Sequence, residues 1–324
     1  MSLKYEDKIF IAGHRGMVGS AILRNLKTKG FDNIITANKN DLDLTSQEQV
    51  KDFFNQIKIN KVIIAAAKVG GIGANSQYPV DFLINNLYIQ SNILSQAYKN
   101  DVEQVLFLGS SCIYPKITES PIKEEQLLSG KLEITNEWYA LAKITGIKLS
   151  EAYNIQYKTD FRSIMPTNLY GPFDNFNLEN GHVIPALINK FHEAVLKKNK
   201  TVEVWGTGNP KREFLHVDDL AEACHFIMNL SKDQYQNVTE ESMSHINVGT
   251  GEDISINELI DELKIISKFS GEISYDKTKP DGTLEKVLDV SKINSLGWKH
   301  KISLTEGLRK TYEWYLSNFP EVRS

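Results

Sequence analysis

The first half of the chain alternates short apolar runs with longer segments in which apolar residues recur every three or four positions. Short apolar runs between turn residues are typical of buried strands, and the longer period is that of amphipathic helices. The expected strands cover residues 9–12, 34–36, 62–66, 105–108 and 161–165. The expected helices cover residues 17–29, 47–56, 80–99 and 138–156, and Gly30 would cap the first of them. This alternation predicts βαβ units that build a parallel sheet.

The pattern changes halfway along the chain, where prolines, glycine and a polar stretch interrupt the alternation. Such interruptions indicate passage into a second lobe. Residues 214–219 resemble a strand that leads into a helix through an aspartate cap, and residues 245–248 form one more expected strand. Either segment could return to the main sheet. We therefore expect a doubly wound α/β domain in residues 1–170 with returning segments near 213–248, and a smaller α/β lobe in residues 171–324.

Composition and charge narrow the classes of function. A chain of 324 residues, 41% of them hydrophobic, can bury a sizeable core. Its net charge of -4 offers no general attraction for nucleic acid or anionic lipid, so we expect neither partner. No apolar run approaches the ~20 residues that span a bilayer. The two cysteines, Cys112 and Cys224, cannot form a disulfide framework, and their use fits a reducing, cytoplasmic location.

A glycine-rich turn follows the first expected strand and opens the first expected helix. It consists of Gly13, His14, Arg15, Gly16, Met17, Val18 and Gly19. Glycines at such a junction permit a tight turn and let the backbone approach a pyrophosphate at the helix N-terminus. The turn alone is a weak signal, because a plain strand-to-helix connection can look the same. Together with the following βα units, it predicts a Rossmann-type nucleotide site.

The end of the second expected strand bears on the choice of cofactor. An acidic residue there would bind the ribose hydroxyls of NAD, and the stretch 36–40 has none. Lys39 and Arg15 could instead meet a 2′-phosphate, which favours NADP(H) over NAD. The alternative is that both are solvated surface charges. Asp43 follows too late for the strand-end role, and it either approaches the adenine or caps the next helix.

Three polar side chains could together support hydride transfer. Tyr139 and Lys143 lie four residues apart, so a helix places them on one face. A tyrosine can protonate a carbonyl oxygen while a hydride adds to its carbon, and a nearby cation would lower its high pKa. Ser110 would hold the carbonyl through a second hydrogen bond. On an extended segment, Cys112 would share the face of Ser110.

These motifs resemble the extended short-chain dehydrogenase/reductase family of nucleotide-sugar enzymes over nearly the whole chain. The resemblance is carried by the stretches 13–19, 65–72, 109–115, 165–172, 182–186 and 212–219. It is strongest toward the branch that converts GDP-4-keto-6-deoxymannose to GDP-L-fucose by epimerising C3 and C5 and reducing C4 with NADPH. The resemblance implies a Rossmann-type domain, a substrate-binding lobe that is mainly C-terminal, and this enzymatic activity.

Matching the family motifs residue by residue implies a role for a thiol and an imidazole. Cys112 falls on the base and His182 on the acid of the epimerisation, beside the reductive group Ser110, Tyr139 and Lys143. The remaining histidines lack metal-ligand spacing, and we expect no metal. Beyond the turn, Lys39 and Asp43, the implied cofactor contacts are Leu108, Gly109, Lys143, Pro166, Asn168, Leu169 and His182.

The resemblance also points to contacts for the nucleotide sugar, namely Lys190, Trp205, Arg212 and Asp281. Trp205 ends an apolar strand and has the alternative of being a core residue. Lys190 departs from the arginine common in close relatives, and it offers charge without the planar fork. Enzymes of this type also act on GDP-4-keto heptoses and 3,6-dideoxy sugars, sometimes by reduction alone, so the sugar stays open.

Two further expectations concern catalysis and assembly. A non-catalytic NADP-binding sensor or scaffold is an alternative, because a fold by itself does not prove activity. The intact Tyr139 and Lys143 pair favours the enzyme. The resemblance also implies a homodimer in which the helix carrying this pair meets the helix at 80–99 across a two-fold axis. Apolar stripes on both helices agree with this, although the core could explain them.

Overall fold

The computed structural model describes residues 2–178, 181–278, 281 and 284–322. Its main sheet has six parallel strands, which in spatial order are β10 (His245–Val248), β5 (Phe161–Pro166), β4 (Gln104–Leu108), β3 (Lys61–Ile64), β1 (Ile9–Ala12) and β2 (Ile34–Ile35). The chain runs from β1 outward to β2 and then crosses back to β3. Strand order therefore reverses beside β1, and the carboxyl ends of strands at such a reversal are where open α/β sheets bind ligands.

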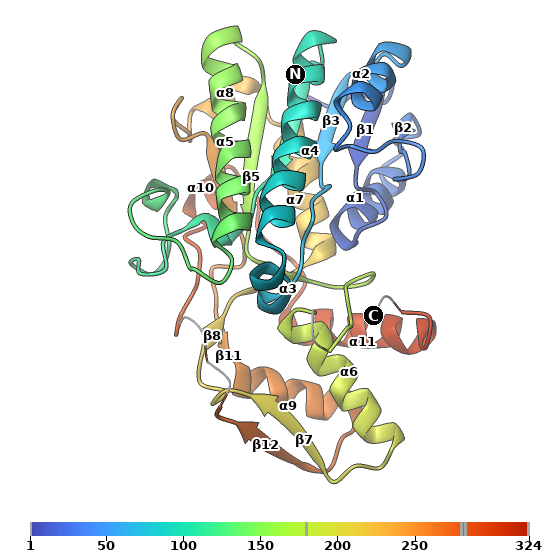
Figure 1. Cartoon of the computed structure of the whole chain (residues 1–324), viewed down its shortest axis with the longest axis vertical. Helices are drawn as coiled ribbons and strands as arrows, with labels where there is room; N and C mark the ends of the chain where they lie inside the picture. The colour runs from blue at the N-terminus through green and yellow to red at the C-terminus, as the bar shows by residue number, and fades with distance from the viewer. Residues whose placement is uncertain (1, 179–180, 279–280, 282–283, 323–324) are drawn as a thin grey trace.

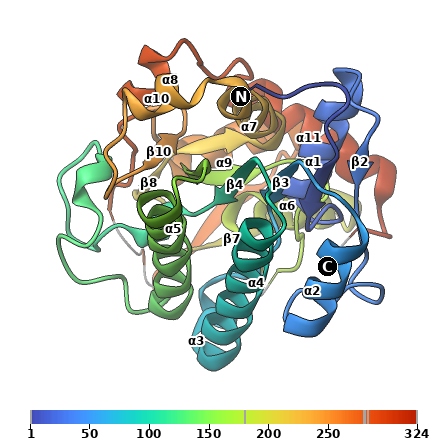
Figure 2. The same cartoon turned by 90° about the horizontal axis from the view of Figure 1, so that it is seen from above.

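Helices cover both faces of this sheet (Figures 1 and 2). One face carries α2 (Gln47–Gln56), α4 (Pro79–Lys99) and α5 (Glu137–Tyr157), and the other carries α1 (Met17–Thr28) and α7 (Val217–Asn229). Every residue of β1, β3, β4 and β5 is buried. Strands buried on both faces read as continuous apolar runs, which is why the sequence revealed them. The doubly wound α/β fold is confirmed.

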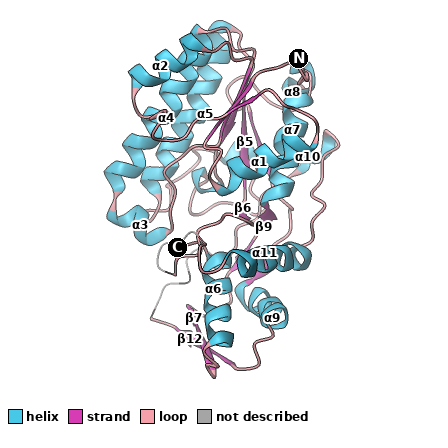
Figure 3. Ribbon diagram, turned by 90° about the vertical axis from the view of Figure 1, so that its right-hand side faces the viewer, coloured by secondary structure: helices cyan, strands magenta, loops and turns pink. Residues whose placement is uncertain are grey.

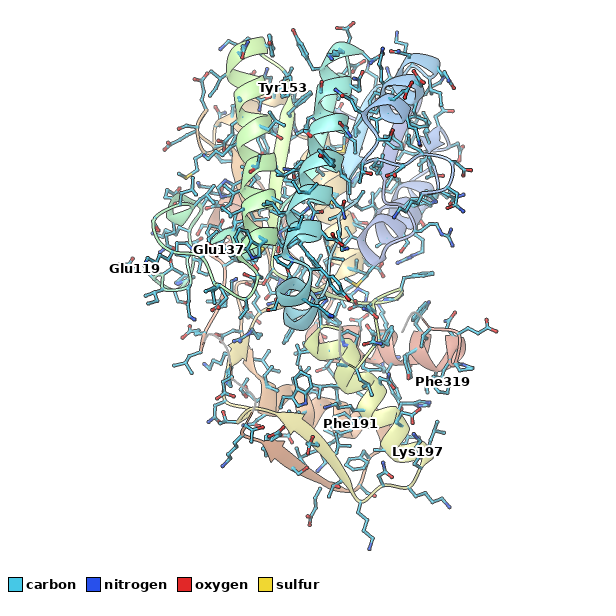
Figure 4. The ribbon with its side chains drawn as sticks, viewed as in Figure 1. Glu119, Glu137, Tyr153, Phe191, Lys197 and Phe319 are labelled. Atoms are coloured by element: carbon cyan, nitrogen blue, oxygen red, sulfur yellow. The ribbon has the colours of Figure 1, made fainter. Side chains whose placement is uncertain are left out.

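A smaller lobe lies beyond the carboxyl ends of the strands (Figure 3). It contains α6 (Val183–Leu196), α9 (Ile256–Ser267), α11 (Leu304–Asn318) and a parallel pair of strands, β7 (Thr201–Trp205) and β12 (Glu272–Asp276). Its own apolar cluster includes Ile188, Phe191, Leu259 and Leu308. Figure 4 shows Phe191 on α6 in this lobe, far from Tyr153 on α5. The remaining short elements are α3 (Ile72–Gln77), η1 (Ser111–Ile113), η2 (Glu124–Gln126), β6 (Asn168–Tyr170), β8 (Lys211–Arg212), β9 (Phe214–His216), α8 (Lys232–Gln236), β11 (Ile254–Ser255) and α10 (Ser291–Ser295).

Later segments return toward the larger core in different ways. β10 joins the main sheet beside β5, but β9 does not, because it pairs with β6 in a separate two-stranded sheet. A third segment also returns, and the sequence pattern did not reveal it. Its residues Leu288 and Ile293 pack into the larger apolar cluster, which is the core around the main sheet. None of the described helices is long and apolar enough to span a bilayer.

Two helix ends test the expected caps. Gly30 follows α1 with a φ of 86°, and its N–H bonds to the carbonyl of Lys27, so it ends the helix as expected. The aspartate cap expected for α7 is wrong. His216 is the N-cap, and its Nδ1 accepts the N–H of Asp218 at 3.2 Å. The carboxylate of Asp218 pairs with Arg24 at 3.0 Å instead.

Candidate active site

The turn between β1 and α1 packs so closely that two of its glycines cannot be replaced without displacement. Gly13 has a φ of +88°, and a Cβ there would lie 2.7 Å from the backbone of Ala66, just after β3. A Cβ on Gly19 would lie 2.1 Å from the carbonyl oxygen of Gly13. Gly16 is the N-cap of α1 and brings no side chain to cover the helix end. The turn therefore presents backbone N–H groups and a helix N-terminus at the strand-order reversal, as a pyrophosphate site requires.

The residues predicted to select the cofactor lie at this same edge. Arg15 follows β1 and Lys39 follows β2. Both side chains are exposed, so their charged groups are accessible to a ligand. The carboxylate of Asp43 accepts the N–H of Thr45 at 2.9 Å and its hydroxyl at 2.7 Å, and these bonds lower the pKa of Asp43. Ser46 caps α2, so the alternative in which Asp43 caps this helix is wrong.

The segment after β4 differs locally from the extended form expected for it. Ser110 is extended, with a φ of -163°, but residues 111–113 form the 3-10 turn η1. Ser110 and Cys112 therefore do not share the face of a strand. The turn still brings them together, because the Ser110 hydroxyl hydrogen-bonds to the Cys112 thiol. Cys112 is 8% exposed, whereas Cys224 is fully buried in the larger core.

Tyr139 and Lys143 lie on the first two turns of α5, at the end of the helix that faces the smaller lobe. Glu137, the first residue of α5, marks this end in Figure 4. The ammonium of Lys143 lies 5.8 Å from the centroid of the Tyr139 ring and donates to the carbonyl of Leu108 at 2.7 Å. This bond ties α5 to the carboxyl end of β4. The hydroxyl and the thiol thus come from Ser110 and η1, and the phenol and the ammonium from α5, which packs against η1.

Burial sets the protonation states of this group. It raises the pKa of Tyr139, and the neighbouring Cys112 charge adds to the effect, so the phenol is protonated at neutral pH. The expectation that Lys143 lowers this pKa stays a prediction. Burial also lowers the pKa of Lys143 to about 8 and raises that of Cys112. A protonated phenol is the form that a proton donor in reduction requires.

One cation beside the thiol was missed in the sequence. Lys286 is the strongest of the charged groups that lower the Cys112 pKa, ahead of Lys143. Burial lowers the pKa of Lys286, and the positive charge of Arg212 lowers it further. Lys286 is thus coupled electrostatically to both Cys112 and Arg212. No local spacing could have indicated it, because more than 170 residues separate it from Cys112.

His182 is the N-cap of α6, a different element from those that carry this group. The residue is exposed, yet surrounding protein atoms lower the pKa of its imidazole by desolvation, which favours the neutral form. Among the described residues, the groups that shift the pKa values of Cys112, Tyr139 and Lys143 do not include His182. Its predicted role as the acid therefore stays a prediction.

The other predicted cofactor contacts lie near the same edge. Leu108 ends β4, and Gly109 continues its pairing by donating to the carbonyl of Ile164 at 2.9 Å. Pro166 ends β5, while Asn168 and Leu169 lie in β6. The amide of Asn168 donates to the carbonyl of Glu213 at 2.9 Å, which fixes its orientation.

The four predicted substrate contacts gather in two pairs. The Lys190 ammonium lies 5.4 Å from the Trp205 ring centroid and donates to the carbonyl of Glu203. Trp205 is 52% exposed, so it is not a core residue. Arg212 donates to the Asp281 carbonyl at 3.4 Å. The Asp281 carboxylate accepts the N–H and the hydroxyl of Thr207, at 2.7 and 2.8 Å.

Comparison with known proteins agrees with this arrangement. Residues 9–249 match the model of the NAD dependent epimerase/dehydratase family. The chain belongs to this family. It is 52% identical over 318 residues to the GDP-L-fucose synthase of Escherichia coli (strain K12), covering 98% of this chain and 99% of that protein.

Two solved structures of the family share the whole architecture. A GDP-6-OMe-4-keto-L-xylo-heptose reductase from C.jejuni superposes with a TM-score of 0.92 at 37% identity, covering 98% of this chain and all of that one. A GDP-L-fucose synthetase from Naegleria fowleri bound to NADP superposes with a TM-score of 0.90 at 29% identity, covering all of this chain and 97% of that one.

Proposed function

We propose that this family member is an NADPH-dependent epimerase/reductase that converts GDP-4-keto-6-deoxymannose to GDP-L-fucose. The observation that carries the proposal is the joining of two chemistries on residues 110–113 and α5. Ser110, Tyr139 and Lys143 form a reductive group, and Cys112 adds a thiol that reduction alone does not need. The 52% identity to a GDP-L-fucose synthase over nearly the full chain supports the same substrate.

The first stage inverts two stereocentres. The C4 ketone acidifies the protons on C3 and C5, so each inversion needs a base on one face of the sugar and an acid on the other. Cys112 would remove the proton and His182 would return one from the opposite face. The second stage reduces C4. When bound, NADPH would supply a hydride to C4. The Tyr139 hydroxyl would donate its proton to O4, and Ser110 would hold O4 by a hydrogen bond.

A substrate panel tests this assignment. We expect NADPH oxidation with GDP-4-keto-6-deoxymannose at a kcat/KM at least about tenfold above that with GDP-4-keto heptoses or 3,6-dideoxy sugars. The structural similarity to a heptose reductase keeps reduction of a heptose as the second candidate. A higher kcat/KM with a GDP-4-keto heptose would show that the heptose, not GDP-4-keto-6-deoxymannose, is the substrate. Binding of NADPH without turnover of any GDP-4-keto sugar would favour the sensor or scaffold.

The cofactor preference can be tested at its two exposed cations. The closely packed turn at 13–19 fits a dinucleotide, and Arg15 and Lys39 would meet the 2′-phosphate. We expect Arg15→Ala and Lys39→Ala each to raise KM for NADPH by about tenfold, while KM for NADH stays unchanged because NADH lacks this phosphate. The exposed Lys51 on α2 provides a control in Lys51→Ala. Equal effects on both cofactors would contradict the assignment.

The pKa of Lys143 predicts how the reductive stage responds to pH. The Lys143 side chain carries its positive charge below about pH 8 and loses this charge as the pH rises through that value. Since only the charged form attracts the developing oxyanion, we expect the single-turnover rate of NADPH oxidation to fall above pH 8. Lys143→Arg would keep its charge and flatten the decline, although its different shape lowers the rate. A wild-type rate that stays constant from pH 7 to 9 would contradict this role.

We also infer that two copies associate through α4 and α5 and that the enzyme is cytoplasmic, as the family resemblance and the unpaired cysteines imply. Val80, Ile84 and Tyr88 expose an apolar stripe along α4, with exposed fractions of 69%, 36% and 50%. Sedimentation should give a dimer of the 36.7 kDa chain, and Tyr88→Asp a monomer. Ile265→Asp, on the exposed face of α9, should remain dimeric. A monomeric wild type would overturn the inference.

A further inference from the structure

A phenylalanine ring lies against the ammonium of Lys143, and the proposed reaction assigns this ring no role. Phe107 belongs to β4, and the Nζ of Lys143 lies over its ring, 4.9 Å from the ring centroid. A cation within about 6 Å of a ring centroid is attracted by the negative face of the ring. Tyr139 offers a second ring, but its centroid lies 5.8 Å from the same nitrogen, near this limit. Phe107 is therefore the closer aromatic contact of the ammonium.

The ammonium has little other stabilisation. The carbonyl of Leu108 accepts one of its N–H groups at 2.7 Å, and the described part of the chain offers it no second hydrogen-bond acceptor. Lys143 is 4% exposed and Phe107 is 1% exposed, so little water reaches the pair. A buried charge is costly unless nearby groups stabilise it. The face of the ring therefore adds to a single hydrogen bond.

Helix α5 leaves room for this ring. Gly146 lies three residues after Lys143, on the same side of the helix. A Cβ on Gly146 would lie 2.3 Å from Cζ of Phe107 and 2.7 Å from Oε1 of Gln90 on α4. A glycine inside a helix is less stable than an alanine, so its presence here agrees with a need for space. The edge of the ring fills that space, while its face meets the ammonium.

Few charged groups act on this ammonium. Cys112, on η1, favours the charged form of Lys143 when the thiol is ionised, whereas burial disfavours it. Tyr139, one turn earlier on α5, is protonated at neutral pH and carries no charge. Among the described residues, no charged group of α4, β4 or β5 adds to these effects. Without the ring, only the thiol and the hydrogen bond to Leu108 would oppose the effect of burial.

We propose that Phe107 is a positioning residue whose ring face holds the Lys143 ammonium at the carboxyl end of β4 and keeps it charged where little water reaches it. The inference deepens the proposed function and rests on it for the link to reduction. Reduction uses this positive charge beside Tyr139, so the ring extends upward the pH range in which the site can reduce its substrate. Leucine fills much of the same space without a π-electron face, and Phe107→Leu therefore separates this electrostatic role from packing.

Nuclear magnetic resonance of lysine labelled with carbon-13 at Cε measures the charge of Lys143 without any sugar. The signal is assigned by its absence in Lys143→Arg, and its titration midpoint is followed from pH 6 to 10. We expect Phe107→Leu to lower the midpoint by about one pH unit, because the lost attraction stabilised only the charged form. With NADPH and GDP-4-keto-6-deoxymannose, the pH at which the single-turnover rate declines should fall by the same amount.

Phe161→Leu is the matched control. Phe161 is fully buried on β5, and its ring centroid lies 5.5 Å from that of Tyr153, near the opposite end of α5 (Figure 4). This variant removes an equal ring beneath the same helix, so it should lower stability but leave the midpoint of Lys143 unchanged. If Phe107→Leu loses the far-ultraviolet circular dichroism of the fold, Phe107→Met replaces it, because its flexible side chain fills irregular space, and the same shift is expected.

An unchanged midpoint in a folded Phe107 variant overturns the proposal, and so does an equal shift in Phe161→Leu. A lowered midpoint in a protein that oxidises no NADPH with any GDP-4-keto sugar would support the role of the ring and contradict only the proposed function. The two failures are therefore distinguishable.

Discussion

Tyr139→Phe is expected to lower the rate of NADPH oxidation with GDP-4-keto-6-deoxymannose by about 10²–10⁴. The variant removes only the hydroxyl that protonates O4. The ring keeps its edge contact with Phe82, so the fold and NADPH affinity should be preserved. Exchange of the C3 and C5 protons should continue, because Cys112 and His182 are untouched. Stopped-flow absorbance at 340 nm measures the oxidation, and fluorescence titration measures the affinity for NADPH.

Tyr153→Phe is the matched control for this prediction. Tyr153 lies on the same helix, far from the smaller lobe (Figure 4), and loss of its hydroxyl should leave the rate unchanged. Reduction at the wild-type rate by Tyr139→Phe would show that another group donates the proton to O4.

Cys112→Ser is expected to lower deuterium incorporation at C3 and C5 in heavy water by about 10² or more. A serine hydroxyl has nearly the same size, but its pKa lies far above that of a thiol, so it cannot serve as the base near neutral pH. The reductive group remains complete, and NADPH binding should therefore be unchanged. Product analysis by mass spectrometry and NMR gives the isotope content at each carbon.

Cys224→Ala controls for loss of a thiol in general. Cys224 is buried in the larger core, so its substitution should cost some stability but leave isotope exchange intact. Wild-type exchange by Cys112→Ser would assign the base to another residue. Loss of exchange together with loss of NADPH binding would indicate a collapsed site rather than a missing base.

The parts of the site that the sequence predicted depend on short-range geometry. Spacing by four residues places Tyr139 and Lys143 on one face of α5, and helix geometry alone ensures this. The glycine turn is recognisable because Gly13 and Gly19 meet backbone that leaves no room for a side chain. The buried strands are recognisable because both of their faces are covered.

The parts that were wrong or missed depend on tertiary structure. His216, Asp218 and Asp219 could each have capped α7. The N-cap is His216, and the carboxylate of Asp218 pairs with Arg24 instead. Burial raises the pKa of Tyr139, and no local sequence pattern predicts that burial. Lys286 lowers the pKa of Cys112 from a segment after the smaller lobe, where the chain returns to the larger core.

The central claim is that one site both inverts C3 and C5 and reduces C4. The most direct test incubates the wild-type protein with GDP-4-keto-6-deoxymannose and NADPH in heavy water and examines the product by NMR. We predict GDP-L-fucose with solvent deuterium at both C3 and C5 and one NADPH consumed per product. Turnover without deuterium at either carbon would show that the protein does not epimerise the sugar. Absence of NADPH consumption would contradict the proposed function as a whole.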